Sequence, residues 1–226
     1  MPVFRLNREL VFPPPELAEP DGLLAVGGDL SPQRLLAAYQ QGIFPWYSGD
    51  EPILWWSLSP RLVLFPEEFH LPRSLARTIK RGIYQVSADT AFAEVIAACA
   101  AVRQESGTWI NQDMQAAYIR LHELGFAHSV ECRFEGELVG GLYGLCLDRM
   151  FFGESMFALR DDASKVAVAA LVSHARSSGI QAIDCQMTTA HMLRFGSREL
   201  DRQAFQELLE QLVQRIQPQE RWRLQA

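Results

Sequence analysis

Apolar residues are concentrated in three consecutive segments, residues 128–134, 138–147 and 150–157, which short turns at 135–136 and 148–149 separate. Apolar segments of this length joined by short turns predict a meander of antiparallel strands. A helical period follows over residues 162–179, and residues 181–187 return to a strand pattern. Strands on either side of a crossover helix predict a mixed sheet with helices packed on it, which is an α/β or α+β arrangement, and of the two we expect an α+β fold.

Capping residues predict further helices. Asp89 and Asn111 each precede a series of apolar residues at helical spacing. Ser31 is followed by a proline, which predicts the start of a helix, and Gly42 predicts its end. A last helix is predicted over residues 201–216, where apolar side chains again recur every three or four positions. These helices supply the layers that cover the predicted sheet.

The N-terminal quarter differs in composition from the rest of the chain. Prolines crowd residues 13–20, and three of the five tryptophans lie within residues 46–56 among Pro, Gly and Asp. We therefore predict a small, helical N-terminal domain with an aromatic loop over residues 1–62 and a larger domain over residues 63–226. Aromatic side chains in such a loop either hold two domains together or form a platform on which a base stacks. Composition alone favours the domain interface.

The formal net charge of −6 argues against a protein that coats nucleic acid by bulk attraction. Positive charge is nevertheless concentrated in one short segment. Its four basic residues stand at positions i, i+4, i+7 and i+8, which share one face of a helix. They are Arg73, Arg77, Lys80 and Arg81. The cluster is either a solvated helix face or a stripe that binds phosphates.

The cysteines are widely spaced in apolar segments and lack clustered histidines. They are Cys99, Cys132, Cys146 and Cys185. This pattern predicts buried free thiols in place of a metal site or a disulfide framework. No apolar run approaches the roughly 20 residues that a membrane helix needs, and the first residues lack the apolar segment of a secretion signal. We therefore expect a cytoplasmic protein.

Three polar side chains stand in the predicted strands and are candidates for chemistry. Asp184 and Gln186 share one face of the strand over residues 181–187. Glu154 lies in a run of phenylalanines. A buried carboxylate costs free energy unless it is hydrogen-bonded, so such residues mark either a site or a structural tie. An Asp that secures a neighbouring loop and a Glu at a solvent-facing strand end are the structural alternatives.

Several blocks in one order resemble the leucyl/phenylalanyl-tRNA-protein transferases over nearly the whole chain. The blocks are GLLAVGGDLSPQRLLAAYQQGIFPW, PILWWS, GTWI, AYIRLHELGFAHSVE, LVGGLYG, FFGESMF, DDASKVA and IDCQ. The resemblance implies an acetyltransferase-like C-terminal domain beside the small N-terminal one. It also implies transfer of Leu, Phe or, less often, Met from aminoacyl-tRNA to the N-terminal Arg or Lys of a protein, which marks that protein for N-end-rule degradation. A monomer that uses neither metal nor cofactor is expected.

The resemblance implies roles for residues at matching positions. Three residues are expected to be catalytic: Asp184, Gln186 and Glu154. In this expectation Asp184 fixes the side-chain amide of Gln186, whose carbonyl holds the incoming amine, and Glu154 suits the positive charge of the acceptor.

The remaining implied roles concern the aminoacyl-tRNA. The terminal adenosine is expected to stack in an aromatic region formed by Tyr39, Trp46, Trp109 and Tyr118. The aminoacyl side chain is expected in an apolar pocket formed by Leu142, Met156, Leu171 and Ile183. The basic cluster is expected to touch the acceptor stem without reading its sequence.

The resemblance weakens after the IDCQ block. Related proteins usually carry Ser-Leu-Gly and then Glu-Ile-Pro-Arg, whereas this chain reads Arg-Phe-Gly at 194–196 and Glu-Leu-Asp-Arg at 199–202. The contribution of this segment to the pocket is therefore left open.

Two other functions fit parts of the sequence. The implied fold also suits a coenzyme A-dependent N-acetyltransferase, but the glycine-rich turn that holds pyrophosphate in such enzymes is replaced by Ala-Leu-Arg-Asp-Asp at 158–162. Two acidic residues at a helix start disfavour a phosphate. A non-catalytic module that binds charged tRNA on the same tryptophans and leaves the ester intact is the second alternative.

Overall fold

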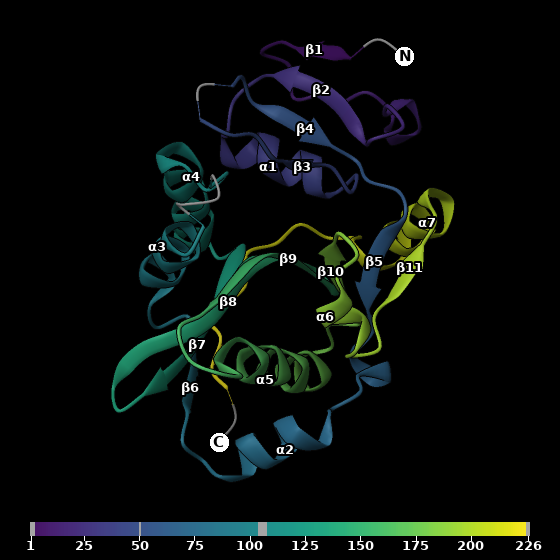
Figure 1. The fold of residues 1–226 in the computed structure, drawn as a ribbon. Helices are drawn as coiled ribbons and strands as arrows, with labels where there is room; N and C mark the ends of the chain where they lie inside the picture. The colour runs from purple at the N-terminus through teal and green to yellow at the C-terminus, as the bar shows by residue number, and fades with distance from the viewer. Residues whose placement is uncertain (1–2, 50, 104–107, 225–226) are drawn as a thin grey trace.

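The computed structural model describes residues 3–49, 51–103 and 108–224, which form two sheets with helices around them (Figure 1). Within these residues, no helix combines the length and the apolar character needed to span a bilayer. Short 3₁₀ helices, η1 (Pro15–Leu17) and η2 (Pro66–Glu68), begin at two of the prolines.

The smaller sheet is built from the N-terminal part of the chain. Its strands lie in the order β1-β2-β4-β3, with bounds β1 (Phe4–Leu6), β2 (Leu23–Gly27), β3 (Phe44–Pro45) and β4 (Leu54–Trp56). The predicted cap at Ser31 is confirmed, because its hydroxyl accepts the N–H of Arg34 at the start of α1 (Pro32–Tyr39). The sequence predicted the helix without the sheet, since strands this short show no alternating pattern.

The larger sheet has seven strands in the order β11-β5-β10-β9-β8-β7-β6. Their bounds are β5 (Arg61–Leu64), β6 (Gln85–Ala88), β7 (Ala127–Phe134), β8 (Glu137–Leu147), β9 (Met150–Ala158), β10 (Ala182–Gln186) and β11 (Arg198–Leu200). Strand β10 runs parallel to β9 and antiparallel to β5, so the sheet is mixed. The α+β fold class and the predicted strand meander are confirmed, and the boundary predicted between residues 62 and 63 falls inside β5.

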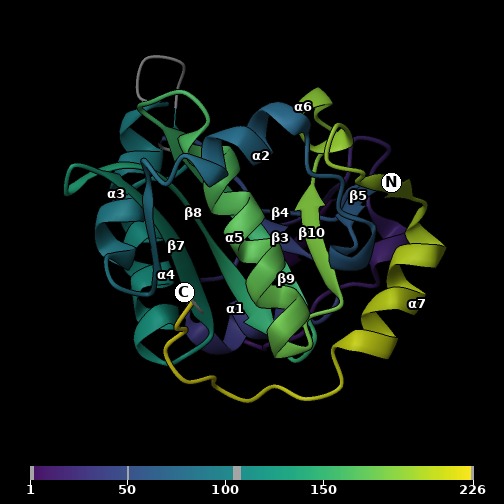
Figure 2. The same cartoon turned by 90° about the horizontal axis from the view of Figure 1, so that it is seen from below.

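Helices cover both faces of the larger sheet (Figures 1 and 2). Their bounds are α2 (Arg73–Lys80), α3 (Phe92–Ala101), α4 (Gln112–Glu123), α5 (Ala163–Ser178), α6 (Ala190–Leu193) and α7 (Arg202–Leu212). The smaller sheet, α3 and α4 share one face, whereas α5 and α2 lie on the other (Figure 1). Alternate residues of the strands pack into two separate cores, so Ala182 faces the N-terminal side and Ile183 faces α5.

One predicted helix cap is wrong. Asn111 does cap α4, but Asp89 adopts a left-handed φ of 55° and leaves the start of α3 to Ala91. The carboxylate of Asp89 instead accepts hydrogen bonds from the ring of His128 and from the main-chain N–H of Trp222, at 2.7 Å each. Asp89 therefore does not cap α3, because its carboxylate accepts hydrogen bonds from residues that are distant in the sequence.

Strands β9 and β10 separate at the centre of the larger sheet. Their parallel pairing covers only Met150–Phe152 and Ala182–Asp184. Near the same level, the register between β8 and β9 shifts, and Glu154 is the extra residue on β9. Gly144 stands at this shift, where a Cβ atom would lie 2.0 Å from the carbonyl oxygen of Phe152. The sheet thus opens beside a bulge that redirects one carboxylate.

Candidate functional site

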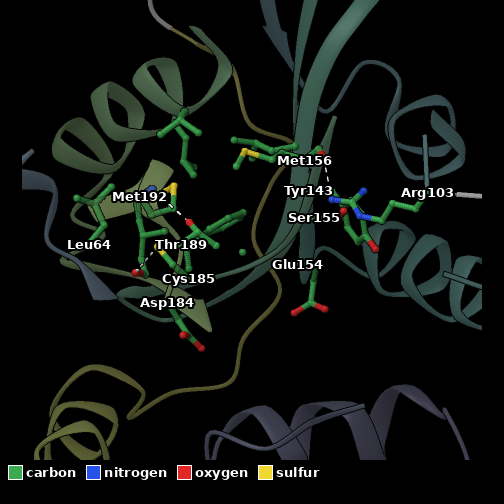
Figure 3. A pocket seen from close by; sticks show the side chains of 16 residues that line it. Leu64, Arg103, Tyr143, Glu154, Ser155, Met156, Asp184, Cys185, Thr189 and Met192 are labelled. Carbon is green, nitrogen blue, oxygen red and sulfur yellow. Dashed lines mark hydrogen bonds between the residues drawn. The ribbon is translucent and has the colours of Figure 1, made fainter. Parts of the chain in front are cut away.

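A cavity of about 170 Å³ lies where β9 and β10 separate (Figure 3). Most of its walls are apolar. All four residues predicted for the aminoacyl pocket line it: Leu142, Met156, Leu171 and Ile183. The carboxylates of Glu154 and Asp184 point away from the side chains of Met156 and Met192, so the carboxylates lie at one end of the cavity and the two methionines at the other (Figure 3). Arg103 also lines the cavity, and its Nη2 donates to the main-chain carbonyl oxygen of Met156 at 3.1 Å.

Glu154 is 7% exposed and accepts three hydrogen bonds from uncharged side chains. The hydroxyls of Tyr39 and Tyr118 donate at 2.7 Å and 3.0 Å, and the side-chain Nε2 of Gln186 donates at 2.9 Å. Burial is the largest influence on this carboxyl and raises its pKa to about 7, although the tyrosine hydroxyls act to lower it. The bulge in β9 therefore presents a carboxylate that titrates near neutral pH.

Asp184 lies in a different electrostatic setting. Its two carboxylate oxygens accept hydrogen bonds from Nε and Nη2 of Arg61, at 2.9 Å and 2.7 Å, and both residues are fully buried. The guanidinium of Arg61 also lies over the rings of Phe44 and Phe205, 4.7 Å and 4.8 Å from their centroids. The charge of Asp184 is therefore neutralised within the protein.

The geometry of Gln186 differs from the expectation. Asp184 accepts the main-chain N–H of Gln186 at 2.8 Å, while the side-chain amide is held by Glu154, so Asp184 does not fix that amide. The register of β10 against β5 shifts here, and Gln186 has a left-handed φ of 58°. Such a conformation is costly for a residue with a side chain and persists where surrounding contacts impose it.

The predicted aromatic region divides into buried and half-buried parts. Tyr39 and Tyr118 are fully buried behind Glu154, and their hydroxyls lie 2.5 Å apart. Trp46 and Trp109 are half-buried. Trp46 packs against Trp56, with ring centroids 5.6 Å apart. The cavity-lining residues do not include Trp46 or Trp109.

The aromatic loop was interpreted either as a contact between domains or as a platform for a base, and the position of Trp55 bears on this choice. Trp55 is fully buried and donates its indole N–H to the carbonyl oxygen of Gly27 at 2.8 Å. This tryptophan therefore belongs to the core of the N-terminal region and is not a surface on which a base stacks.

The basic cluster lies on α2 and the residue that follows it. Arg73, Arg77, Lys80 and Arg81 are all exposed, and Leu75 is the buried residue of this helix. Helix α2 packs on the α5 side of the larger sheet, away from the smaller sheet (Figure 1). The four side chains thus form a solvated positive face, and binding of phosphates by this face stays a prediction.

Sequence reasoning missed several residues of the site. Arg61, which pairs with Asp184, was not considered. The cavity is also lined by residues that were not assigned to it: Leu64, Arg103, Tyr143, Phe151, Gly153, Ser155, Val168, Cys185, Thr189 and Met192. The sequence does contain a signal for Arg61, because this basic residue begins an apolar strand. A guanidinium that is buried there requires a buried acidic or polar partner. The four cysteines are free, as predicted; Cys99, Cys132 and Cys146 are also buried as predicted, whereas Cys185 is half-buried. Among the described residues no group of three or more His, Cys, Asp or Glu side chains is arranged to hold a metal ion.

Two family models match the chain. Residues 63–210 match the leucyl/phenylalanyl-tRNA protein transferase model, and residues 28–59 match the N-terminal domain model of the same family. The chain belongs to this family. A leucyl/phenylalanyl-tRNA–protein transferase from Syntrophobacter fumaroxidans is 56% identical over 98% of this chain and 96% of its own length. A family member of the same name from Aromatoleum aromaticum is 59% identical over 86% of this chain and 83% of its own length.

Solved structures similar to this family member are more distant. FemX has 10% sequence identity and a TM-score of 0.48, covering 79% of this chain and 71% of its own. A GCN5-related N-acetyltransferase from Kribbella flavida has 14% identity and a TM-score of 0.42, covering 74% of this chain and 60% of its own.

Proposed function

We propose that this chain transfers leucine or phenylalanine, and less often methionine, from aminoacyl-tRNA to the N-terminal Arg or Lys of acceptor proteins. The observation that carries the proposal is an apolar cavity with Glu154 at one end, a buried carboxyl with a pKa of about 7. The apolar walls suit an aliphatic or aromatic side chain, and the carboxylate suits an amine. Membership of the transferase family supports the same reaction.

The donor side chain enters the cavity between β9 and β10, and its ester carbonyl stays at the acidic end. Leu142, Met156, Leu171 and Ile183 then surround the side chain. An apolar pocket discriminates by size and shape, so methionine is tolerated while β-branched and polar side chains fit poorly.

The α-amino group of the acceptor is the nucleophile, with a reference pKa of about 7.7 to 8.0. Its nitrogen bonds to the ester carbonyl carbon while Glu154 accepts one of its protons. The bond between that carbon and the ribose oxygen then breaks, and the proton passes to the leaving ribose oxygen through the 2′-hydroxyl. The ester is already activated, so the proposed reaction consumes no further cofactor.

Gln186 and Asp184 have separate roles in this proposal. Because the amide N–H of Gln186 donates to Glu154, its amide oxygen is the end that accepts a hydrogen bond from the incoming amine. Asp184 is paired with Arg61, so it acts as a positioning residue that holds the main chain of Gln186 in its left-handed conformation. Orientation of the amine then contributes to the rate along with proton transfer.

The tRNA is proposed to bind at two places. Trp46 and Trp109 stack on the terminal adenosine, and the exposed basic face of α2 contacts phosphates of the acceptor stem. Such contacts add affinity without reading sequence. Charged tRNA occurs in the cytoplasm, where we propose that the enzyme acts, and the added Leu or Phe marks its target for N-end-rule degradation.

The decisive experiment mixes the purified chain with radiolabelled Leu-tRNA and a peptide that begins with Arg. We expect a labelled peptide that begins Leu-Arg. The matched controls are the same peptide with an acetylated amino terminus and a peptide that begins with Glu, and neither should be labelled.

Two results would contradict the proposal. Retention of labelled tRNA on a filter without any peptide product would indicate a non-catalytic binding module. Acetylation of the same peptide with acetyl-coenzyme A, in place of aminoacylation, would indicate the N-acetyltransferase alternative.

A further inference from the structure

The short helix α6 forms part of the cavity wall. It contributes Met192, and Thr189 directly precedes it. The hydroxyl of Thr189 accepts the main-chain N–H of Met192 at 3.2 Å and so caps the helix. Phe195 donates its N–H to the carbonyl oxygen of Met192 at 3.0 Å, which holds the other end. The position of Met192 in the wall is therefore fixed by hydrogen bonds at both ends of one helical turn.

Met192 lies at the apolar end of the cavity. In Figure 3 Met192 lies across the cavity from Met156, and both lie away from the carboxylates of Glu154 and Asp184. If the reacting ester lies at the acidic end, the apolar end receives the tip of the donor side chain. A residue in that position limits the length of the side chain that the cavity admits.

The next residue along α6 has a different environment. Met192 is 8% exposed, whereas Leu193 is 46% exposed and does not line the cavity. The two neighbours share one helix and similar apolar character, but only Met192 faces the space that a donor would fill. Substitutions at Met192 and at Leu193 can therefore be compared to distinguish the loss of a contact in the cavity from a general disturbance of α6.

We propose that Met192 is a specificity-determining residue that limits the size of the aminoacyl side chain accepted by the cavity. This inference rests on the proposed transferase function. Methionine is unbranched and adaptable, so it can pack against both a branched aliphatic tip and a flat aromatic ring. A pocket that accepts both leucine and phenylalanine needs such an adaptable wall.

The test measures kcat/KM for transfer from Leu-tRNA, Phe-tRNA and a tRNA charged with tryptophan to one peptide that begins with Arg. For Met192→Ala, we expect the Leu value to fall about ten-fold, because a leucine tip no longer reaches the wall. The Phe value should fall less, and Trp transfer should rise. Met192→Phe should instead reduce Phe and Trp transfer more than Leu transfer. Met192→Leu, with a similar volume, should restore most of the original preference.

The control Leu193→Ala should leave the order of the three donors unchanged. An unchanged Phe-to-Leu ratio in both Met192→Ala and Met192→Phe would overturn the inference, as would an equal shift in Leu193→Ala. If Met192→Ala does not fold, as judged by circular dichroism, Met192→Phe and Met192→Leu decide the question in the same way. Failure of the unsubstituted protein to transfer any amino acid would instead refute the proposed function.

Discussion

Two buried carboxyl groups in this molecule have opposite pKa shifts although burial opposes ionisation of both. Around Glu154 the hydrogen-bond donors are two tyrosine hydroxyls and an amide, and burial raises the pKa to about 7. Around Asp89 burial also acts to raise the pKa. The hydrogen bond and charge of His128, together with main-chain N–H groups of Trp222 and Ser129, outweigh it and lower the pKa.

The difference shows that the kind of hydrogen-bond donor matters, because each carboxylate accepts three hydrogen bonds. Two hydroxyls and an amide offset less of the cost of burying the charge than a histidine and two main-chain N–H groups do. Asp89 holds the C-terminal segment to the larger sheet, since Trp222 stacks on His128 with ring centroids 4.2 Å apart. In the proposed function Glu154 accepts a proton from the acceptor amine. On that proposal one region uses a carboxylate for stability and the other uses one for chemistry.

The pH dependence of stability should differ in sign between the two groups. The folded pKa of Glu154 is raised from 4.5 to about 7, so its contribution favours folding below pH 4.5 and is lost as pH rises to about 7. The folded pKa of Asp89 is lowered from 3.8, so its contribution is present above that value and is lost as pH falls through the folded value.

The largest expected effect tests the stabilising role of Asp89. In Asp89→Ala the ring of His128 and the main-chain N–H groups of Ser129 and Trp222 lose their acceptor in a buried setting. We expect the free energy of unfolding to fall by about 3–5 kcal/mol, as measured by urea titration followed by circular dichroism. Aminoacyl transfer by the folded fraction should be retained. A loss of activity with unchanged stability would reverse the roles assigned to the two regions.

The next effect tests the reactive role of Glu154. Glu154→Gln keeps the shape of the side chain but removes the proton acceptor, so we expect kcat to fall about 100-fold at saturating substrates. The rate of the unsubstituted protein should rise as pH increases through about 7, because the carboxylate form is the active one. That rise should be absent in the variant, and only the titration of the acceptor amine should remain.

Glu131 provides the matched control. It is also fully buried and accepts hydroxyl hydrogen bonds from Ser87, Thr90 and Ser129, but it does not line the cavity. Glu131→Gln should preserve kcat and its pH profile. An equal loss of kcat in both variants would mean that any buried glutamate supports the fold, and the role of Glu154 as proton acceptor would be withdrawn.

The regular strands of the larger sheet could be predicted from the sequence, whereas the irregularities in strand pairing that form the site could not. The three strands within residues 128–157 were predicted because they are apolar segments that end at the turns Glu135-Gly136 and Asp148-Arg149, and the structure confirms those strands. The bulge at Glu154 and the left-handed Gln186 interrupt the regular strand pairing, and the sequence pattern did not predict either of them. They arise from contacts between distant segments.

The hydrogen-bond partners of the candidate residues could not be predicted from the sequence either. Arg61 and Asp184 are 123 positions apart, and Tyr39 and Glu154 are 115 positions apart. Periodicity indicates which residues are buried but not which buried polar groups meet. The resemblance supplied the residues of the pocket, while only the structure shows that Asp184 is already neutralised by an arginine.

The smallest expected effect concerns the donors that hold the pKa of Glu154 down. Tyr118 donates to Glu154 at 3.0 Å, and this hydrogen bond lowers the carboxyl pKa against the effect of burial. In Tyr118→Phe the pKa of Glu154 should therefore rise, so less of the enzyme carries the carboxylate at neutral pH. We expect kcat at pH 7 to fall by about two- to five-fold if the pKa rises by about half to one unit, and most of the loss to be recovered at pH 8.5. Tyr143→Phe is the control, since Tyr143 lines the same cavity and packs against Tyr118, but its buried hydroxyl has no hydrogen-bond partner among the residues that the structure describes. Its loss should leave the pH profile of kcat unchanged. A loss in Tyr118→Phe that persists at pH 8.5 would show that this hydroxyl supports the site by packing or substrate contact, and that the donors around Glu154 do not set its reactivity.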